Sequence, residues 1–416
     1  MYFYFFAILK KKKKFFGFNS HQKKNEIKKT KSKKKIKEKK IMNFNCNKLE
    51  LSEAITNVSK AVPSKSSIPQ LEGIKLSLTG NDLTLTGYNL ELGITTTVNV
   101  INNDSSNGKY IINARLFSDI VRKMPSDNIN IIINKNDDMK AHIKANNTNC
   151  KIAVLSAEDY PEFPDISTGD SVSIPQKLLK DMIHQTIYAV SVSDIKPVLT
   201  GELFDISNGN FNLVAVDGKR LAIRHENISC SDAFKFVVPA KTLDEVSKLL
   251  KDDASATDCQ IVNTSRHITF QIDKYKIISR LLEGEFHDYS RSVPTQFDTE
   301  VILKVKDLSD CLERCSLLIN EKNRAPIKLN FQNDTLQIGC ETPLGNIDEE
   351  ISINMTGEPL LIGLNNKFLL DALRASDCDQ VKLLMNSPVK PMVIVPMQSD
   401  SFTFLLMPIQ LKGNRS

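Results

Sequence analysis

The apolar residues of this chain follow two spacings, one typical of strands and one typical of helices. The stretches 82–94 (DLTLTGYNLELGI) and 210–223 (NFNLVAVDGKRLAI) alternate apolar and polar residues, which predicts strands with one buried face. Elsewhere apolar residues recur three or four positions apart, which predicts short amphipathic helices. Helices are expected at 48–61, 113–124, 175–190, 239–250, 305–318 and 365–376.

The order of these elements repeats three times along the chain. The motif P-x-L-x-G begins at Pro69 and again at Pro197, and a weaker copy begins at Pro326, so the prolines are 128 and 129 residues apart. The hexapeptides LSAEDY and LLEGEF are 126 residues apart, and so are the basic residues near the start of each second helix. Three sets of matches at nearly one period predict three copies of a domain of about 125 residues.

Each copy contains a helix, two or three strands, a second helix and further strands. This order is typical of an α+β domain whose helices lie on one side of antiparallel sheet. We therefore expect three tandem domains, at 42–165, 171–294 and 299–416. The linkers between them, at 161–171 and 291–300, are rich in Pro, Ser, Thr and Asp.

The net charge of +6 is unevenly distributed. Residues 1–41 hold 16 lysines and two glutamates, which leaves 39 basic and 47 acidic residues in the rest, so the body of the chain is acidic. The apolar run that opens the chain is about half as long as a membrane-spanning helix, and its lysines follow the run, unlike those of a secretory signal. Three interpretations remain for 1–41: a disordered basic arm, an organelle-type presequence, or translated sequence upstream of a start at Met42. The third is favoured because Lys, Asn, Ile and Phe dominate the segment.

Motifs for enzymatic chemistry are absent from the sequence. It contains no Walker A, GxGxxG, GxSxG, HExxH or EF-hand pattern, and its eight cysteines form no CxxC pair or zinc-type cluster. We expect no metal, no cofactor and reduced thiols. The turn AVDGKRLAIR (215–224) is the one candidate, because Asp217, Gly218, Lys219 and Arg220 could bind an anion. Its spacing favours a plain strand–turn–strand.

An ordered set of motifs resembles one known family. The stretches IPQLEG, PVLTGELFDI, LVAVDGKRLAIR, SRLLEGEFHDY and FLLMPIQL together resemble the beta subunit of bacterial DNA polymerase III, the processivity sliding clamp, over 42–411. The resemblance implies a non-catalytic DNA clamp fold, in which two protomers close head to tail into a homodimeric ring around double-stranded DNA. It further implies a cytoplasmic protein that binds no membrane. Its partners would be the replicative polymerase, the clamp loader and repair proteins, each bound through a short linear peptide.

The resemblance also implies three sets of site residues. The hole would be lined by basic residues on the helices and adjoining turns, against the alternative that these are ordinary solvated helix faces. The DNA-facing set is Lys65, Arg115, Arg122, Lys177, Lys196, Lys241, Lys248, Arg314, Lys367 and Arg374, with Lys48, Lys60, Lys123, Lys180 and Lys306 as further candidates.

Partner peptides would bind an apolar pocket between the second and third domains. Its residues would be Leu199, Val216, Gly218, Lys219, Arg220, Leu221, His287, Arg291, Val389, Pro391, Leu405 and Met407. The chain departs from the family pattern at Lys219, His287 and Gln410, and KGNRS follows Leu411. These departures bear on peptide preference.

Ring closure would join domain one of one protomer to domain three of the other through edge strands. Cys150 and Ile152 would face Leu317 and Leu318, with Glu349 and Glu350 as ion-pair partners. Two rival functions stay open on sequence alone. One is a three-domain peptide-binding adaptor that never encircles DNA, and the other is an enzyme that uses the turn 217–220.

Overall fold

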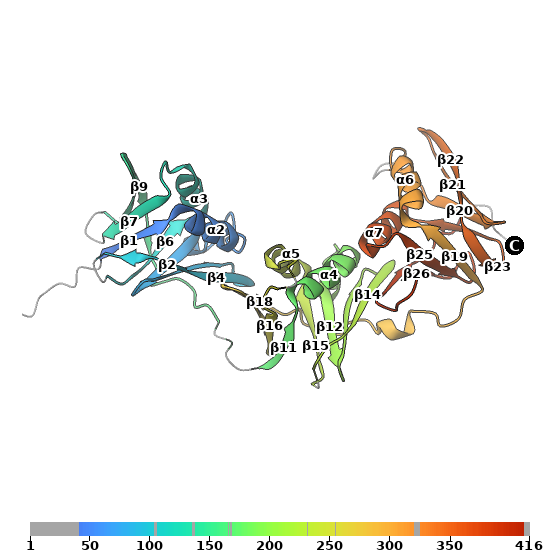
Figure 1. Ribbon diagram of the computed structural model, residues 1–416, viewed down its shortest axis with the longest axis horizontal. Helices are drawn as coiled ribbons and strands as arrows, with labels where there is room; N and C mark the ends of the chain where they lie inside the picture. The colour runs from blue at the N-terminus through green and yellow to red at the C-terminus, as the bar shows by residue number, and fades with distance from the viewer. Residues whose placement is uncertain are drawn as a thin grey trace, which may run out of the picture.

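The computed structural model describes residues 41–103, 106–134, 138–164, 166, 169–230, 232–253, 255–319 and 325–411. The predictions for 1–40 and for the C-terminal KGNRS therefore lie outside the described residues. The described chain forms three lobes that lie side by side in a crescent (Figure 1).

Each lobe contains two α-helices and two groups of antiparallel strands. The first lobe comprises β1 (Ile41–Asn47), α2 (Lys48–Ser59), η1 (Pro69–Glu72), β2 (Gly73–Thr79), β3 (Asp82–Tyr88), β4 (Leu92–Asn99), β5 (Ile101–Asn102), β6 (Gly108–Asn113), α3 (Ala114–Lys123), β7 (Asn128–Asn134), β8 (Lys140–Ala145), β9 (Thr148–Ala153) and β10 (Leu155–Ser156). The second comprises β11 (Asp170–Ile174), α4 (Gln176–Thr186), η2 (Ile187–Ala189), η3 (Pro197–Thr200), β12 (Gly201–Ser207), β13 (Asn210–Val216), β14 (Arg220–Asn227), β15 (Phe234–Pro239), α5 (Ala240–Leu249), β16 (Cys259–Asn263), β17 (His267–Ile272) and β18 (Tyr275–Arg280).

The third lobe follows the linker turn η4 (Tyr289–Arg291). It comprises β19 (Thr299–Lys304), α6 (Val305–Cys315), β20 (Ile327–Gln332), β21 (Thr335–Thr342), β22 (Gly345–Ser352), β23 (Asn354–Gly357), β24 (Leu360–Leu364), α7 (Asn366–Ser376), β25 (Gln380–Met385), β26 (Met392–Pro396) and β27 (Phe402–Leu406).

Local sequence explains where the second helix of each lobe begins. Asn113 caps α3 by accepting a hydrogen bond from the backbone N–H of Leu116 at 3.0 Å, and Asn365 caps α7 in the same way. Pro239 takes this position before α5, and its ring restricts the backbone to the conformation that a helix start needs. One face of each helix is then buried against sheet; in α3 this face includes Phe117 and Val121.

The lobes are joined by continuous sheets. One nine-stranded sheet, in the order β10-β6-β2-β3-β4-β18-β17-β16-β11, crosses the first boundary, where β4 pairs with β18. A second, in the order β15-β12-β13-β14-β27-β26-β25-β19-β23, crosses the second boundary, where β14 pairs with β27. A five-stranded sheet, β5-β1-β7-β8-β9, and a four-stranded sheet, β22-β21-β20-β24, stand at the two ends of the crescent. The helix pairs lie on its concave side (Figure 1).

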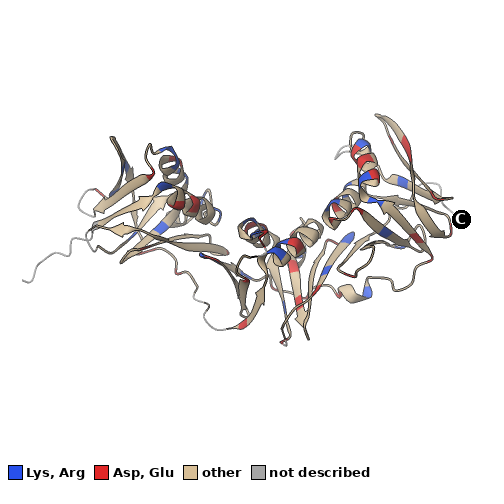
Figure 2. Cartoon of the chain, viewed as in Figure 1, with Lys and Arg blue, Asp and Glu red and all other residues tan. Residues whose placement is uncertain are grey.

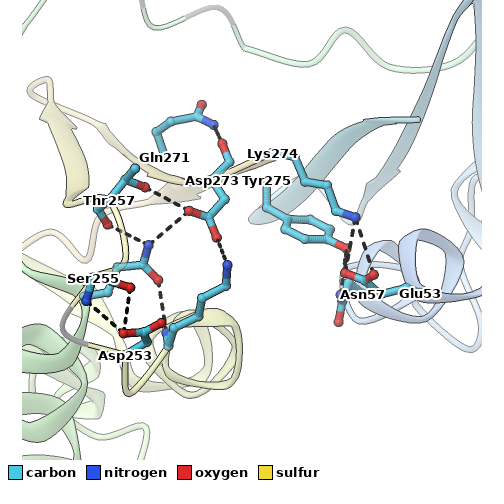
Figure 3. Close-up of polar contacts among 11 residues, drawn as sticks. Glu53, Asn57, Asp253, Ser255, Thr257, Gln271, Asp273, Lys274 and Tyr275 are labelled. Carbon is cyan, nitrogen blue, oxygen red and sulfur yellow. Dashed lines mark hydrogen bonds and ion pairs between the residues drawn. The ribbon is translucent and has the colours of Figure 1, made fainter. Parts of the chain in front are cut away.

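Side chains add a second connection at the first boundary, on the helix side of the sheet (Figure 3). The Tyr275 hydroxyl, in β18, donates to Glu53 Oε1 of α2 at 2.8 Å and accepts from Asn57 Nδ2 at 2.9 Å. Asp273, in the preceding turn, accepts hydrogen bonds from Thr257 Oγ1 and Lys251 Nζ of its own lobe. Hydrogen bonds thus attach the β17–β18 turn to its own lobe through Asp273 and to the first lobe through Tyr275.

Candidate functional site

A cleft of about 480 Å³ lies at the boundary between the second and third lobes. The turn η3 and the β13–β14 hairpin form one wall, and the end of β27 forms the floor beside them. The linker that leaves β18 closes the other side. The lining residues are Lys196, Val198, Leu199, Val216, Gly218, Arg220, Leu221, Glu285, His287, Ser292, Pro391, Leu405 and Met407.

The DGKR stretch forms a tight turn at the edge of this cleft. Asp217 Oδ1 accepts hydrogen bonds from the backbone N–H groups of Lys219 and Arg220 at 2.8 and 3.0 Å. Gly218 has a φ of +87°, a conformation that side-chain-bearing residues adopt only with strain. The Met407 N–H donates to the Lys219 carbonyl at 2.8 Å, which ties the turn to the third lobe. The carboxylate of Asp217 therefore holds a backbone turn.

Arg220 links the two lobes beneath the cleft. Its guanidinium donates to Asp217 Oδ2 at 3.0 Å and to Asp371 Oδ2 of α7 at 2.9 Å, and its side chain is only 9% exposed. It also lies over the ring of Phe368, 4.3 Å from the centroid. A guanidinium engaged in this way positions the two lobes, so the apolar neighbours are left to contact a ligand.

The structure brings most of the predicted pocket residues together. Three lie outside the lining: Lys219 is exposed on the turn, Arg291 pairs with Asp288 in η4, and Val389 is 69% exposed beside Pro391. Sequence reasoning missed Val198, Glu285 and Ser292, and it assigned Lys196 to the DNA-facing set. Val198 stands inside the P-x-L-x-G motif and could have been found there.

The polar rim of the cleft comes from the linker. His287 Nε2 lies 2.9 Å from Ser292 Oγ, and Glu285 stands beside this pair in the lining. The path of the linker, which no local pattern encodes, brings Glu285 and Ser292 to the cleft. The site is therefore an apolar floor with a polar rim, a form suited to a peptide with apolar anchors.

Basic and acidic residues are interspersed on the inner helices (Figure 2), and the basic residues fall into two groups. Some are paired with acids of a helix, of a loop or of strand β22; among them are Arg122 with Asp119, Lys248 with Asp244 and Glu245, Arg314 with Glu349, Arg374 with Glu313, Lys60 with Glu245 and Lys180 with Asp252. Hydrogen bonds from Lys248 to these carboxylates raise the pKa of its ammonium group, and the Arg314 guanidinium lowers the pKa of Glu349.

The second group is exposed and makes no ion pair with another described residue. Its helix members are Arg115, Lys177, Lys241, Lys367 and Lys123, and Lys65 is a loop member. Lys123 ends α3, whereas each of the other four is the second residue of its helix; Lys306 holds this position in α6, where it pairs with Asp310. A cation in the first turn opposes the helix dipole. Helix stability therefore does not explain the four residues at the helix starts.

The predicted ring-closing residues lie at the two ends of the crescent. Cys150 and Ile152 are in the edge strand β9, where Ile152 is buried in the core of its own lobe and Cys150 is half-buried. Leu317, which follows α6, is 75% exposed, whereas Leu318 packs against the core of its own lobe. Ile152 and Leu318 thus pack in the cores of their own lobes. Leu317 is the member of this set whose apolar side chain is exposed and free to contact another chain.

Among the residues that the structure describes, no group of three or more His, Cys, Asp or Glu side chains is arranged to hold a metal ion. No helix in the same ranges is both long enough and apolar enough to cross a membrane.

Comparison with known proteins gives concordant matches over the described body. Residues 42–164, 173–288 and 290–410 match the family models described as the N-terminal, central and C-terminal domains of the DNA polymerase III beta subunit. A beta sliding clamp of Staphylococcus epidermidis is 30% identical over 379 residues, which cover 89% of this chain and 100% of the relative.

Solved structures agree with these matches. The DNA polymerase sliding clamp of Bacillus subtilis superposes with a TM-score of 0.85 at 28% identity, covering 89% of this chain and 99% of its own. A sliding clamp from Pseudomonas aeruginosa, solved bound to griselimycin, gives 0.83 at 27% identity, covering 89% and 100%. The expected α+β fold of tandem clamp domains is confirmed.

Proposed function

The chain belongs to the DNA polymerase III beta subunit family, whose members are non-catalytic sliding clamps of replication, and on this premise we propose that two copies close head to tail into a ring around duplex DNA. Family membership favours this function over a peptide-binding adaptor and over an enzyme that uses the turn 217–220. The proposed setting is the cytoplasm, on chromosomal DNA.

The pairing of strands at the lobe boundaries is the observation that supports a ring. At both internal boundaries, the third strand of one lobe's first sheet pairs with the last strand of the next lobe's second sheet: β4 with β18, and β14 with β27. The equivalent strands at the ends of the crescent are β22 and β9, and both are edge strands. An exposed edge is a template for pairing with another chain. A β22–β9 pair between copies would repeat the internal boundary.

Charge and apolar surface support this pairing. The exposed side of β22 carries Asp348 and Glu350, whereas the exposed side of β9 carries Lys151. Leu317 and Leu344 lie at the β22 end of the crescent and are 75% and 63% exposed. Opposite charges across paired strands favour the correct partner and register. Because the contact joins two different surfaces, closure depends on the curvature of the crescent.

Contact with DNA is proposed for the unpaired helix cations. Arg115, Lys241 and Lys367 recur at one position of the repeat, so a closed ring would present them at regular angles around the hole. Lys177 takes the second position of the first helix of the second lobe. Contacts to phosphates are independent of sequence and weaken with salt. The paired cations hold neighbouring acids instead, which leaves a lining that attracts DNA without gripping it.

Partner binding is proposed for the cleft between the second and third lobes. The ligand class is a short linear peptide with an apolar anchor, such as a segment of the replicative polymerase, the clamp loader or a repair protein. Burying each apolar side chain of such a peptide contributes about 1.5–3 kcal/mol. Leu221 and Met407 both line the cleft; Leu221 is nearly buried in its wall, whereas Met407 is 43% exposed, and methionine adapts to anchors of different shape.

A double variant tests the cleft. We expect Leu221→Ala with Met407→Ala to weaken binding of a peptide from the organism's replicative polymerase by about ten-fold or more, which corresponds to about 1.4 kcal/mol. Ile101→Ala with Leu116→Ala is the matched control, since both residues are exposed and remote from the cleft. Calorimetric titration measures the affinities. Equal affinity for the double variant and the control would refute the site.

A further inference from the structure

The two internal boundaries share one construction in detail. At the second boundary, Asp217 caps a turn whose Lys219 carbonyl accepts from the Met407 N–H. At the first boundary, Asn89 Oδ1 accepts from the N–H groups of Glu91 and Leu92, at 3.0 and 2.7 Å. The Glu91 carbonyl then accepts from the Arg280 N–H at 2.9 Å. The first boundary therefore has the same walls as the proposed partner cleft, with η1 in the place of η3.

The first boundary differs because its cleft is filled. Phe163, in the linker that leaves the first lobe, packs edge-on against Tyr88, with 5.6 Å between ring centroids. It also lies directly over Gly93, where an added Cβ would stand 2.2 Å from Phe163 Cε2. The equivalent positions of the open cleft are Val216 and Leu221. The glycine thus makes the space that the phenylalanine ring occupies.

The linker after the second lobe takes a different course. By the 126-residue repeat, Tyr289 is the equivalent of Phe163. Its hydroxyl donates to Asp205 Oδ2 at 2.9 Å and accepts from Asn212 Nδ2 at 3.3 Å, on β12 and β13. This polar anchorage holds the Tyr289 ring on the sheet of the second lobe and leaves the cleft beside Leu221 and Met407 open.

We propose that the first boundary is a second peptide-binding cleft, latent in this structure because the chain's own linker, residues 157–164, is its bound ligand and Phe163 is the anchor. The ligand class, a short peptide with an aromatic anchor, rests on the proposed function of the open cleft. Pro161 and Pro164 flank the anchor and restrict the linker, so it is already shaped for binding. A partner peptide gains access only when the linker leaves.

Two variants of the anchor residue open the latent cleft. Phe163→Asp removes the anchor, because a carboxylate does not remain in an apolar site. Phe163→Ala removes the ring and leaves its space empty. Gly93→Leu added to either variant is the control, because the new side chain fills the space that an aromatic anchor needs. The probe is the synthetic octapeptide AEDYPEWP, the sequence of 157–164 with Trp in place of Phe163. The chain contains no tryptophan, so the fluorescence anisotropy and emission wavelength of the peptide report its binding alone.

We expect both variants to bind the probe at least about ten-fold more tightly than the unsubstituted chain, with a blue-shifted emission. Unlabelled AEDYPEFP should compete, and AEDYPEAP should not. Adding Leu221→Ala with Met407→Ala, which disables the open cleft, should leave this binding unchanged. Failure of the open cleft would thus appear in the polymerase-peptide titration and not here.

Two results would overturn the proposal. One is probe binding to neither variant beyond the level of the unsubstituted chain. The other is binding that disappears with the Leu221 and Met407 substitutions, because the probe would then occupy the open cleft. Gly93→Leu added to either variant should return probe binding to the level of the unsubstituted chain. Thermal unfolding of both variants accompanies the titration; if Phe163→Asp unfolds, Phe163→Ala decides the outcome by the same criterion.

Discussion

At the residue scale, Glu202 departs most from the chain's own repeat. By strand register its equivalents in the first and third lobes are Ile74 and Ile327, which are fully buried, and Glu202 is fully buried as well. This register places Pro326 level with Gly201, so the expected match of Pro326 to Pro197 was wrong. Glu202 Oε1 accepts from Thr186 Oγ1 at 3.2 Å, while Oε2 has no hydrogen-bond partner among the described residues. Burial raises the pKa of this carboxyl well above the ordinary 4.5.

The raised pKa predicts a pH-dependent stability. The neutral Glu202 side chain makes its full contribution to the free energy of unfolding below about pH 4.5, the unfolded-state pKa. This contribution is lost as the pH rises toward the raised pKa of the folded state. Glu202→Gln, which cannot ionise, should therefore melt progressively higher than the unsubstituted chain as the pH increases from about 4.5 to about 8. Thermal unfolding at a series of pH values measures this, with the exposed Glu283→Gln as control. A difference in melting temperature that does not change with pH contradicts the assignment.

Arg220 supports a second prediction at this scale. Arg220→Ala removes a buried cation from between Asp217 and Asp371, and breaking such a pair costs about 3–5 kcal/mol. We expect a loss of this order in the free energy of unfolding, measured by denaturant titration. Asp371→Asn combined with Arg220→Ala should lose much less than the sum of the single losses. A loss below about 0.5 kcal/mol for Arg220→Ala would show that the link is dispensable.

At the element scale, the proposed assembly depends on the edge strands β22 and β9 and on the residues beside them. Leu317→Asp places a carboxylate on an exposed apolar position beside β22, so it should abolish self-association without altering the melting of the single chain. Light scattering should give twice the 46.7 kDa chain mass for the unsubstituted protein and the single mass for the variant. Leu90→Asp, also at an exposed leucine but at the first boundary, is the control. An unchanged mass for Leu317→Asp would reject this end of the crescent as the interface.

The exposed cations at the helix starts lead to a prediction about the salt dependence of DNA binding. Neutralising Arg115, Lys177, Lys241 and Lys367 to alanine should reduce the salt dependence of clamp–DNA affinity, by up to about 0.9 in the log–log slope per lost phosphate contact. The same change at Lys235, which pairs with Asp205 away from the helices, is the control. An unaltered slope in the fourfold variant would show that these cations face solvent and not phosphate.

Elements were easier to predict from sequence than their connections. The six helices could be located because apolar spacing and helix-start residues such as Asn113, Pro239 and Asn365 act locally. The pairing of β4 with β18 joins residues as far apart as Thr96 and Tyr275, and neither strand carries a local signal for it. The same holds for the cleft. Its residues that lie in sequence motifs could be identified, whereas Glu285 and Ser292 lie in the linker and reach the cleft only through the path that the linker takes in the folded chain.

At the scale of the whole molecule, the three lobes, the two continuous sheets and the edge strands β22 and β9 at the two ends match half of the proposed ring. Enclosure gives such a ring its hold on DNA, so strong contacts are unnecessary and the mixed charge of the inner helices is sufficient (Figure 2). The acidic body would then repel DNA from the outer surface while the unpaired cations attract it to the hole.

Retention on DNA after loading tests this account most directly. The protein is loaded by its clamp loader onto nicked circular DNA, and half of the sample is then linearised by a single cut before gel filtration at moderate salt. A protein that encloses DNA should stay with the circles and slide off the linear molecules. Equal retention on circular and linear DNA would contradict enclosure and would require direct binding instead.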